Sequence, residues 1–202
     1  RDPEMSRGLG DVYKRQTLGF KASPVNGLWF NVFGGYRISK DELFCNLVDA
    51  DGYYFTHFLQ DKAKTAYGGA ELKYGYKDWF DASLKGTFYS WKTDNENEEL
   101  YLVTKPKFEL NFYAEAKVFE GLKVNLGYEY VQRKEYVIEE GNSSKDFGLG
   151  NISNLSVGAS YTFLKDLSVF GRVNNLLNKQ YYYEYGYPAE KLNVLAGLSL
   201  VF

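Results

Sequence analysis

The segment FELNFYAEAKV, residues Phe108–Val118, alternates between apolar and other side chains along its whole length. One set of alternate positions is entirely apolar and consists of Phe108, Leu110, Phe112, Ala114, Ala116 and Val118. The intervening set consists of Glu109, Asn111, Tyr113, Glu115 and Lys117. Because successive side chains of a β-strand point to opposite faces, this period of two predicts a strand with one apolar and one polar face.

The same alternation recurs from residue 17 to the end of the chain. It predicts nine strands, at 17–24, 28–37, 67–76, 80–89, 108–118, 122–130, 155–163, 167–174 and 192–202. A soluble β-sandwich also alternates, with its apolar face packed inward. Strands of soluble proteins run for about 5–6 residues, however, whereas a tilted strand needs roughly 9–11 residues to cross a bilayer. The length of these segments therefore favours an all-β, antiparallel, up-and-down transmembrane β-barrel.

Composition narrows the function classes. The chain has 202 residues, of which 18% are aromatic, and carries a formal net charge of −2. A nucleic-acid-binding protein normally shows a basic excess, so we expect no nucleic-acid partner. Mean hydropathy is −0.42 and long apolar runs are missing, which excludes a transmembrane helix but not strands that alternate across a bilayer.

The charged side chains of the predicted strands all fall on the polar set of positions, which we expect to face the lumen. The residues that we expect to face the lumen include Arg37, Glu71, Lys73, Asp81, Lys85, Glu109, Glu115, Lys117, Lys123, Glu129 and Arg172. A simple ion-selective pore would show a local bias toward one sign. The mixed signs fit a lumen packed against a polar plug, with plain solvation of the lumen as the alternative.

The connections between these strands alternate in length. Short turns stand at Asn26-Gly27, Lys77-Asp78, Glu120-Gly121 and Lys165-Asp166, and long polar connections at 38–65, 93–105, 134–150 and 180–190. Short turns at one end and long loops at the other are typical of outer-membrane barrels. Aromatic residues also gather at both ends of the apolar faces, as in the belts at membrane interfaces.

The strand count predicts that the barrel is incomplete. Complete single-chain bacterial barrels have an even number of strands, and an open edge inside lipid leaves backbone groups unpaired. We therefore expect residues 17–202 to be C-terminal strands of a larger barrel whose first strands are missing from this chain. Residues 1–16 show no alternation and resemble translated sequencing-adapter read-through, so we interpret them as a non-native leader.

Catalytic and metal-binding patterns are weak. His57 is the single histidine and has no evident serine or aspartate partner, so we expect no enzyme activity. An outer-membrane barrel hydrolase, the least favoured alternative, would lose its activity on His57→Ala. Acidic stretches at 48–52 and 94–99 do not supply a complete calcium loop, and Cys45 is the single cysteine. We therefore expect neither a metal nor a cofactor.

The final 30 residues carry a more specific pattern. The stretch VNNLLNKQYYYEYGYPAEKLNVLAGLSLVF, from Val173 to Phe202, resembles the C-terminus of TonB-dependent outer-membrane receptors, particularly those of Bacteroidetes-type bacteria. The resemblance lies in the Asn-Leu-Leu-Asn-Lys-Gln-Tyr motif at 175–181, the Gly-Tyr-Pro at 186–188 and the terminal Phe202. The chain departs from that pattern at Leu177, where the family usually has Phe, and at 188–190, where Pro-Ala-Glu replaces Pro-Gly-Arg.

This resemblance implies an energised importer in the bacterial outer membrane. Such receptors have a 22-stranded barrel, and TonB pulls on an N-terminal plug to admit a siderophore, haem, cobalamin or glycan. The present chain would supply wall strands and extracellular loops, and would reach TonB only through a plug that it lacks. Its direct partners would be the lipid bilayer, the outer-membrane assembly machinery and a small-molecule or glycan ligand. A fragment of a passive porin is the alternative.

Aromatic residues in the long connections are the best candidates for ligand contact. These residues are Tyr53, Tyr54, Phe55, Tyr101, Tyr182, Tyr183 and Tyr185. Tyrosine and phenylalanine provide large flat surfaces, and tyrosine adds a hydroxyl group. The alternative is that these rings pack on one another at the membrane interface.

The resemblance also assigns a role to the end of the chain. The last strand ends with Leu198, Leu200 and Phe202 on one face, and a terminal phenylalanine resembles the signal that the outer-membrane assembly machinery recognises. Deleting Phe202 from the protein is therefore expected to reduce the folded amount in the outer membrane, measured by heat-dependent mobility on gels. Normal assembly of the deletion variant would contradict this role.

Overall fold

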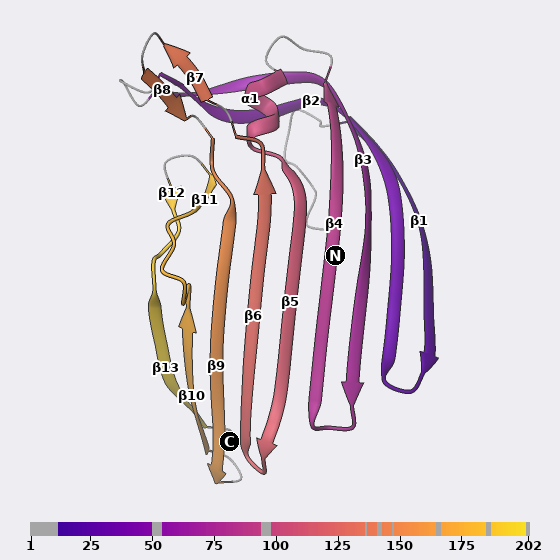
Figure 1. Ribbon diagram of the computed structural model, residues 1–202, viewed down its shortest axis with the longest axis vertical. Coiled ribbons are helices and arrows are strands. Elements are labelled where there is room, and N and C mark those ends of the chain that lie inside the picture. The colour runs from indigo at the N-terminus through magenta and orange to yellow at the C-terminus, as the bar shows by residue number, and fades with distance from the viewer. Residues whose placement is uncertain are drawn as a thin grey trace.

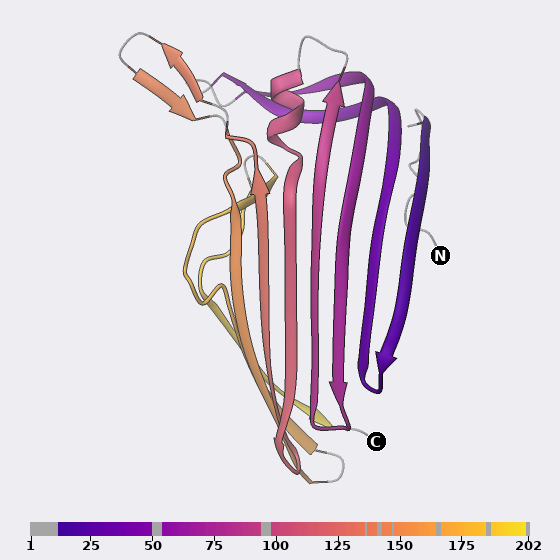
Figure 2. The same cartoon turned by 45° about the vertical axis from the view of Figure 1, so that its right-hand side comes forward.

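The computed structural model describes residues 12–49, 54–93, 98–135, 137–140, 143–146, 148–164, 167–184 and 187–200. Nine strands form one antiparallel sheet in the order β1-β2-β3-β4-β5-β6-β9-β10-β13. They are β1 (Val12–Val25), β2 (Leu28–Asp49), β3 (Tyr54–Tyr76), β4 (Phe80–Thr93), β5 (Pro106–Phe119), β6 (Leu122–Arg133), β9 (Ile152–Leu164), β10 (Leu167–Asn174) and β13 (Asn193–Leu200). The sheet is a curved wall in which long strands lie side by side (Figures 1 and 2).

All nine strands predicted from the alternation are present, and each is paired with its neighbour in chain order among these nine. Within the described residues, β1 pairs only with β2 and β13 only with β10, so these two strands are the edges of the sheet. The short turns include Gly27 with φ of 82° and Gly121 with φ of 86°, a conformation that glycine adopts without strain. The up-and-down topology predicted from the sequence is therefore confirmed.

The long connections hold the remaining elements, and here the prediction of loops needs correction. These elements are α1 (Glu98–Val103), β7 (Val137–Glu140), β8 (Ser143–Asp146), β11 (Tyr182–Glu184) and β12 (Tyr187–Pro188). The segment 38–65 is largely a continuation of β2 and β3, which remain paired as far as Asp49 and Tyr54. Cross-strand backbone pairing continues there although the apolar and polar residues no longer alternate cleanly. The strands predicted from the alternation were therefore shorter than β2 and β3 are in the structure.

The start of β1 lies inside the segment interpreted as a leader. Val12 pairs with Lys40 and Gln16 with Tyr36, so residues 12–16 extend the first strand. Pairing of a backbone segment does not depend on its origin, because every residue other than proline carries the same donor and acceptor. The non-native origin of residues 1–16 therefore stays a prediction.

One face of the sheet is apolar and exposed. Cross-strand partners share a face, so the row Phe30, Leu72, Leu84, Phe112 and Tyr128 crosses β2 to β6 on this side. Exposed fractions on the same side reach 85% for Leu18, 66% for Phe88 and 72% for Leu198. Soluble proteins rarely leave so large an apolar area uncovered, so this face requires a lipid or protein covering.

The opposite face is polar. Its central row runs Asn31, Glu71, Lys85, Asn111, Glu129 and Asn154 from β2 to β9. The alternation within each strand places all eleven charged residues predicted for the lumen on this face. Ion pairs on it join Lys73 to Glu71 at 2.9 Å and Lys123 to Glu115 at 3.0 Å. That this face lines a lumen stays a prediction.

Among the described residues, no helix is long and apolar enough to cross a membrane.

The two faces should respond differently to a new charge. Leu84 lies on the apolar face midway between Phe80 and Phe88 in β4. Leu84→Arg is expected to lower the free energy of unfolding in phospholipid vesicles by about 2–4 kcal/mol, because a charge at the bilayer midplane is poorly solvated. The matched control Asn111→Arg, on the polar face, should change it by less than about 0.5 kcal/mol. Equal costs in a urea titration would contradict the assignment of the faces.

Candidate functional site

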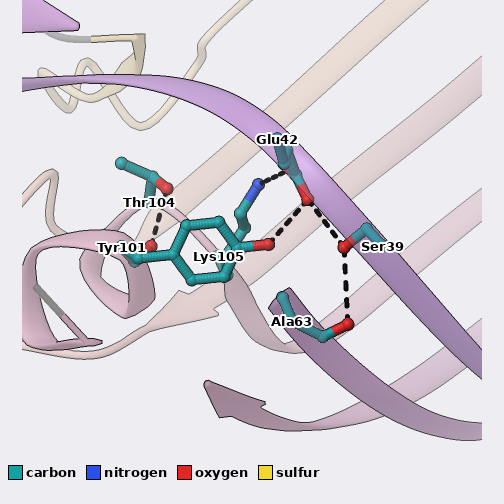
Figure 3. Close-up of polar contacts among 6 residues, drawn as sticks. All are labelled: Ser39, Glu42, Ala63, Tyr101, Thr104 and Lys105. Carbon is teal, nitrogen blue, oxygen red and sulfur yellow. Dashed lines mark hydrogen bonds and ion pairs between the residues drawn. The ribbon is translucent and has the colours of Figure 1, made fainter. Parts of the chain in front are cut away.

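The polar face is covered at one end by α1. The Tyr101 side chain is fully buried against Ala63 of β3 and meets Trp91 of β4 edge-on, with ring centroids 6.2 Å apart. The ring of Tyr101 makes these apolar contacts, while its hydroxyl group reaches polar residues at the edge of the cluster. This packing fixes the helix against the extended ends of β2 and β3, and Figure 3 shows the Tyr101 hydroxyl group directed toward Glu42.

A polar network holds the same helix, and we call Ser39, Glu42, Tyr101 and Lys105 the α1 latch. The Lys105 ammonium donates to Glu42 Oε1 at 2.6 Å. The Tyr101 hydroxyl and the Ser39 hydroxyl both donate to Glu42 Oε2, at 2.8 and 3.0 Å (Figure 3). The Glu42 carboxylate therefore accepts one hydrogen bond from a charged ammonium and two from neutral hydroxyl groups. Hydrogen bonds to a charged group are stronger than those between neutral groups.

The latch shifts the pKa values of its members. Burial raises the pKa of Glu42, but the Lys105 ammonium and the hydrogen bonds outweigh it and bring the pKa below its ordinary value. Burial and the adjacent Glu42 carboxylate raise the pKa of Tyr101, which therefore remains a neutral donor. Glu42 is thus held as a carboxylate at neutral pH.

Farther along the polar face lies a hollow of about 230 Å³ lined by basic and aromatic residues. Its lining is Arg15, Phe33, Arg37, Thr65, Tyr67, Lys85, Thr87, Tyr89 and Trp91. The Lys85 ammonium stands 5.6 Å from the centroid of the Phe33 ring, and the Tyr89 hydroxyl donates to Glu109 at 2.8 Å. Such a surface suits a flat or anionic group.

A larger cavity of about 450 Å³ lies at the ends of β9, β10 and β13, beneath the 175–190 connection, and we call it the amide pocket. Its lining is Asn154, Asn174, Asn175, Tyr181, Tyr183, Tyr187, Pro188, Ala189, Glu190 and Asn193. Figure 1 shows β11 and β12, which carry part of this lining, beside the ribbon of β9. Four amide side chains and three tyrosines line this one cavity.

Asn175 holds the connection that covers the amide pocket. It is 1% exposed and has φ of 49°, a left-handed conformation that asparagine tolerates better than most residues. Its amide nitrogen donates to the carbonyls of Lys179 at 2.7 Å and Glu190 at 3.0 Å. Its amide oxygen accepts from the Lys179 backbone nitrogen at 3.2 Å. Asn175 is therefore a structural residue that shapes the pocket.

Tyrosines form one wall of the amide pocket. Tyr181 is buried with Val131 and Ile152, and its ring meets that of Tyr183 edge-on at 5.5 Å. The Tyr183 hydroxyl donates to Glu129 Oε2 at 2.8 Å. Burial and the Glu129 carboxylate raise the pKa of Tyr183, so the hydroxyl stays protonated and fixed in direction.

The aromatic residues predicted from the sequence to contact a ligand differ in their surroundings. Tyr183 lines the amide pocket, whereas Tyr101 is fully buried in the α1 latch and so is not available to a ligand in this arrangement. Tyr182 is partly buried, and the Arg133 guanidinium donates to its carbonyl at 2.6 Å. Tyr53 and Tyr185 lie outside the described residues, as do the side chains of Tyr54 and Phe55.

Other sequence hypotheses fall partly outside the described part of the chain. Phe202 lies beyond it, while Leu198 and Leu200 are exposed on the apolar face of β13. Cys45 and His57 are backbone partners in β2 and β3, and their side chains are not described. Among the residues that the structure describes, no three histidine, cysteine or acidic side chains gather in a group that could hold a metal ion.

The amide pocket was not found from the sequence. Asn174 and Asn193 are polar positions at the ends of consecutive strands of the sheet and pair with each other in the structure. Because the register of β10 and β13 was unknown, the sequence could not bring the two residues together. A search for polar residues at the two ends of the long connection between the last two strands would have found this pair.

Comparisons with known proteins identify the fold. No family model matches the sequence, and no curated protein is similar to it. The pyoverdine outer membrane receptor FpvA from Pseudomonas aeruginosa is similar in structure, with a TM-score of 0.69 and 15% identity over 94% of this chain and 30% of that one.

Two further receptors show the same likeness. For the siderophore receptor PirA from Acinetobacter baumannii the TM-score is 0.65, with 15% identity over 94% of this chain and 32% of PirA. For the ferric enterobactin receptor PfeA from Pseudomonas aeruginosa the values are 0.64 and 17%, over 94% of this chain and 31% of PfeA. The chain therefore spans about a third of these structures and has the fold of the barrels of TonB-dependent receptors.

The α1 latch should open at acid pH. Because the pKa of Glu42 is lowered in the folded protein, its stabilising effect is complete above the ordinary value of 4.5 and is lost as the pH falls through the lowered value. In a variant that keeps Trp91 as its only tryptophan, the emission of Trp91 is expected to shift to the red in that acid range. The Glu42→Gln variant should lack the transition, and an identical transition in both proteins would contradict the role of Glu42.

Proposed function

We propose that this chain is part of the barrel wall of a TonB-dependent receptor in the bacterial outer membrane, where it takes part in the uptake of a scarce nutrient. One observation carries the proposal. A nine-stranded sheet, apolar and exposed on one face and charged on the other, superposes on the barrels of outer-membrane receptors over 94% of its length.

The two faces would then have separate roles. The apolar face, with Leu84 and Leu198 exposed, would contact lipid, and the backbone groups would be satisfied within the sheet. The charged face would line the interior of the barrel, where it would meet a plug or water. Residues 17–202 would be the C-terminal strands, and the plug and the TonB contact would belong to other parts of the protein.

The position of the two hollows supports this proposal. Both hollows are on the polar face. The amide pocket adjoins the long 175–190 connection, and the basic and aromatic hollow extends to Arg37 and Trp91, near the 38–65 and 93–105 connections. In outer-membrane barrels the longer loops are extracellular. A ligand arriving from outside the cell would therefore reach these hollows first, which supports a role of the chain in binding rather than in catalysis.

A passive porin is the competing function, and conductance separates the two. The protein, expressed at the length that its gene encodes, should fractionate with the outer membrane and change mobility on heating in detergent. In a planar bilayer the purified protein should show no steady ion conductance, because a plugged lumen blocks ions. Steady conductance would instead indicate a porin, and recovery in the aqueous fraction without detergent would indicate a soluble protein.

A further inference from the structure

We propose that the amide pocket binds a neutral, hydroxyl-rich ligand, namely a saccharide. The inference rests on the proposed function, because it names the class of molecule that such a receptor would take. It concerns a cavity of about 450 Å³, which falls within the roughly 300–1,000 Å³ that small-molecule sites occupy.

Hydrogen bonds fix the direction of each amide in the pocket. The backbone nitrogen of Asn175 donates to Asn154 Oδ1 at 3.2 Å, which leaves the Asn154 Nδ2 group without a partner among the described residues. Asn193 Nδ2 donates to the Lys191 carbonyl at 3.3 Å, so its oxygen accepts from Asn174 Nδ2 at 2.9 Å. Asn174 Oδ1 is then also left without a partner in the described part of the chain.

The pocket therefore offers one open donor, Asn154 Nδ2, and one open acceptor, Asn174 Oδ1. A hydroxyl group both donates and accepts, so neighbouring hydroxyls of a sugar can satisfy both atoms at once. Both amides come from strands of the sheet, β9 and β10, and each is hydrogen-bonded to a neighbouring residue, so they are held in place before a ligand arrives.

The charge of the lining excludes an anionic ligand. None of the ten lining residues is lysine or arginine, and one of them, Glu190, is acidic. Three basic residues of the polar face, Arg15, Arg37 and Lys85, line the other hollow instead. A carboxylate, phosphate or catecholate group would find no counter-ion in the amide pocket, whereas an uncharged ligand needs none.

Two exposed rings favour a sugar over a peptide. Tyr183 is 50% exposed and Tyr187 is 74% exposed, and both line the pocket. The hydroxyl of Tyr183 is held by Glu129 at 2.8 Å, so the ring is fixed while its surface remains open. A flat aromatic ring packs well on the apolar C–H face of a pyranose, and its own loss of conformational entropy on binding is small.

The direct test is titration calorimetry on the protein purified from the outer membrane in detergent. The probes are neutral hexasaccharides of glucose, xylose and mannose, with hexaglycine as the peptide probe and citrate as the anion probe. At least one hexasaccharide is expected to bind, and hexaglycine and citrate are not. Binding of hexaglycine or citrate alone, or of no probe, would overturn the inference.

Single substitutions test whether the saccharide binds in the amide pocket. Asn154→Asp keeps the oxygen that Asn175 needs and replaces the open donor by an acceptor, so the Kd for the saccharide should rise about tenfold or more. Tyr187→Ala removes an exposed ring and should also raise the Kd about tenfold. Asn111→Asp is the matched control, because Asn111 and Asn154 are both cross-strand neighbours of Glu129, and its Kd should stay within about twofold.

The same preparation separates this inference from the proposed function. Unchanged affinity in Asn154→Asp and Tyr187→Ala, or an equal loss in Asn111→Asp, would overturn the assignment of the amide pocket. If the protein folds in the outer membrane but binds no saccharide, only the ligand class fails. If it does not reach the outer membrane, the proposed function itself fails.

Discussion

The structure depends on a single constraint, which is that the backbone is paired across long strands while the side chains on one face remain uncovered. Buried apolar side chains in the described residues are few, and they cluster around Tyr101 and around Ile152 rather than beneath the sheet. Such a sheet lacks the hydrophobic core that stabilises a soluble domain. In the outer-membrane location that we propose, lipid would cover the apolar face and neighbouring strands would satisfy the backbone.

The connections between the strands are attached to this sheet by side-chain interactions, whereas the strands are joined by backbone hydrogen bonds. Hydrogen bonds from side chains to backbone fix the 175–190 connection through Asn175, and an ion pair with its associated hydrogen bonds fixes α1 through Glu42. Each of these polar networks stands beside one of the two small apolar clusters, around Tyr101 and around Ile152. This arrangement produces two hollows of different chemistry on one face, one basic and aromatic and the other neutral and rich in amides.

Much of the fold could be predicted because a two-residue period is a strong local pattern. Strands such as Phe80–Thr93 carry it almost without interruption, and their pairing follows chain order. The extension of β2 to Asp49 and the helix at Glu98–Val103 were missed, because neither shows a clean alternation. The site was harder to predict, because the burial of Tyr101 and the presence of Asn154 and Asn174 in one pocket depend on contacts between segments far apart in the sequence.

The central claim is that alternate residues of these strands face lipid and an aqueous interior. The most direct measurement is a nitroxide scan of positions 81–89 in β4, made in bilayers with Cys45 replaced, in which accessibility to oxygen and to a water-soluble nickel complex is recorded. The account predicts high oxygen accessibility at the even positions and high nickel accessibility at the odd positions, with a period of two. Equal accessibility at both sets, or the opposite phase, would contradict it.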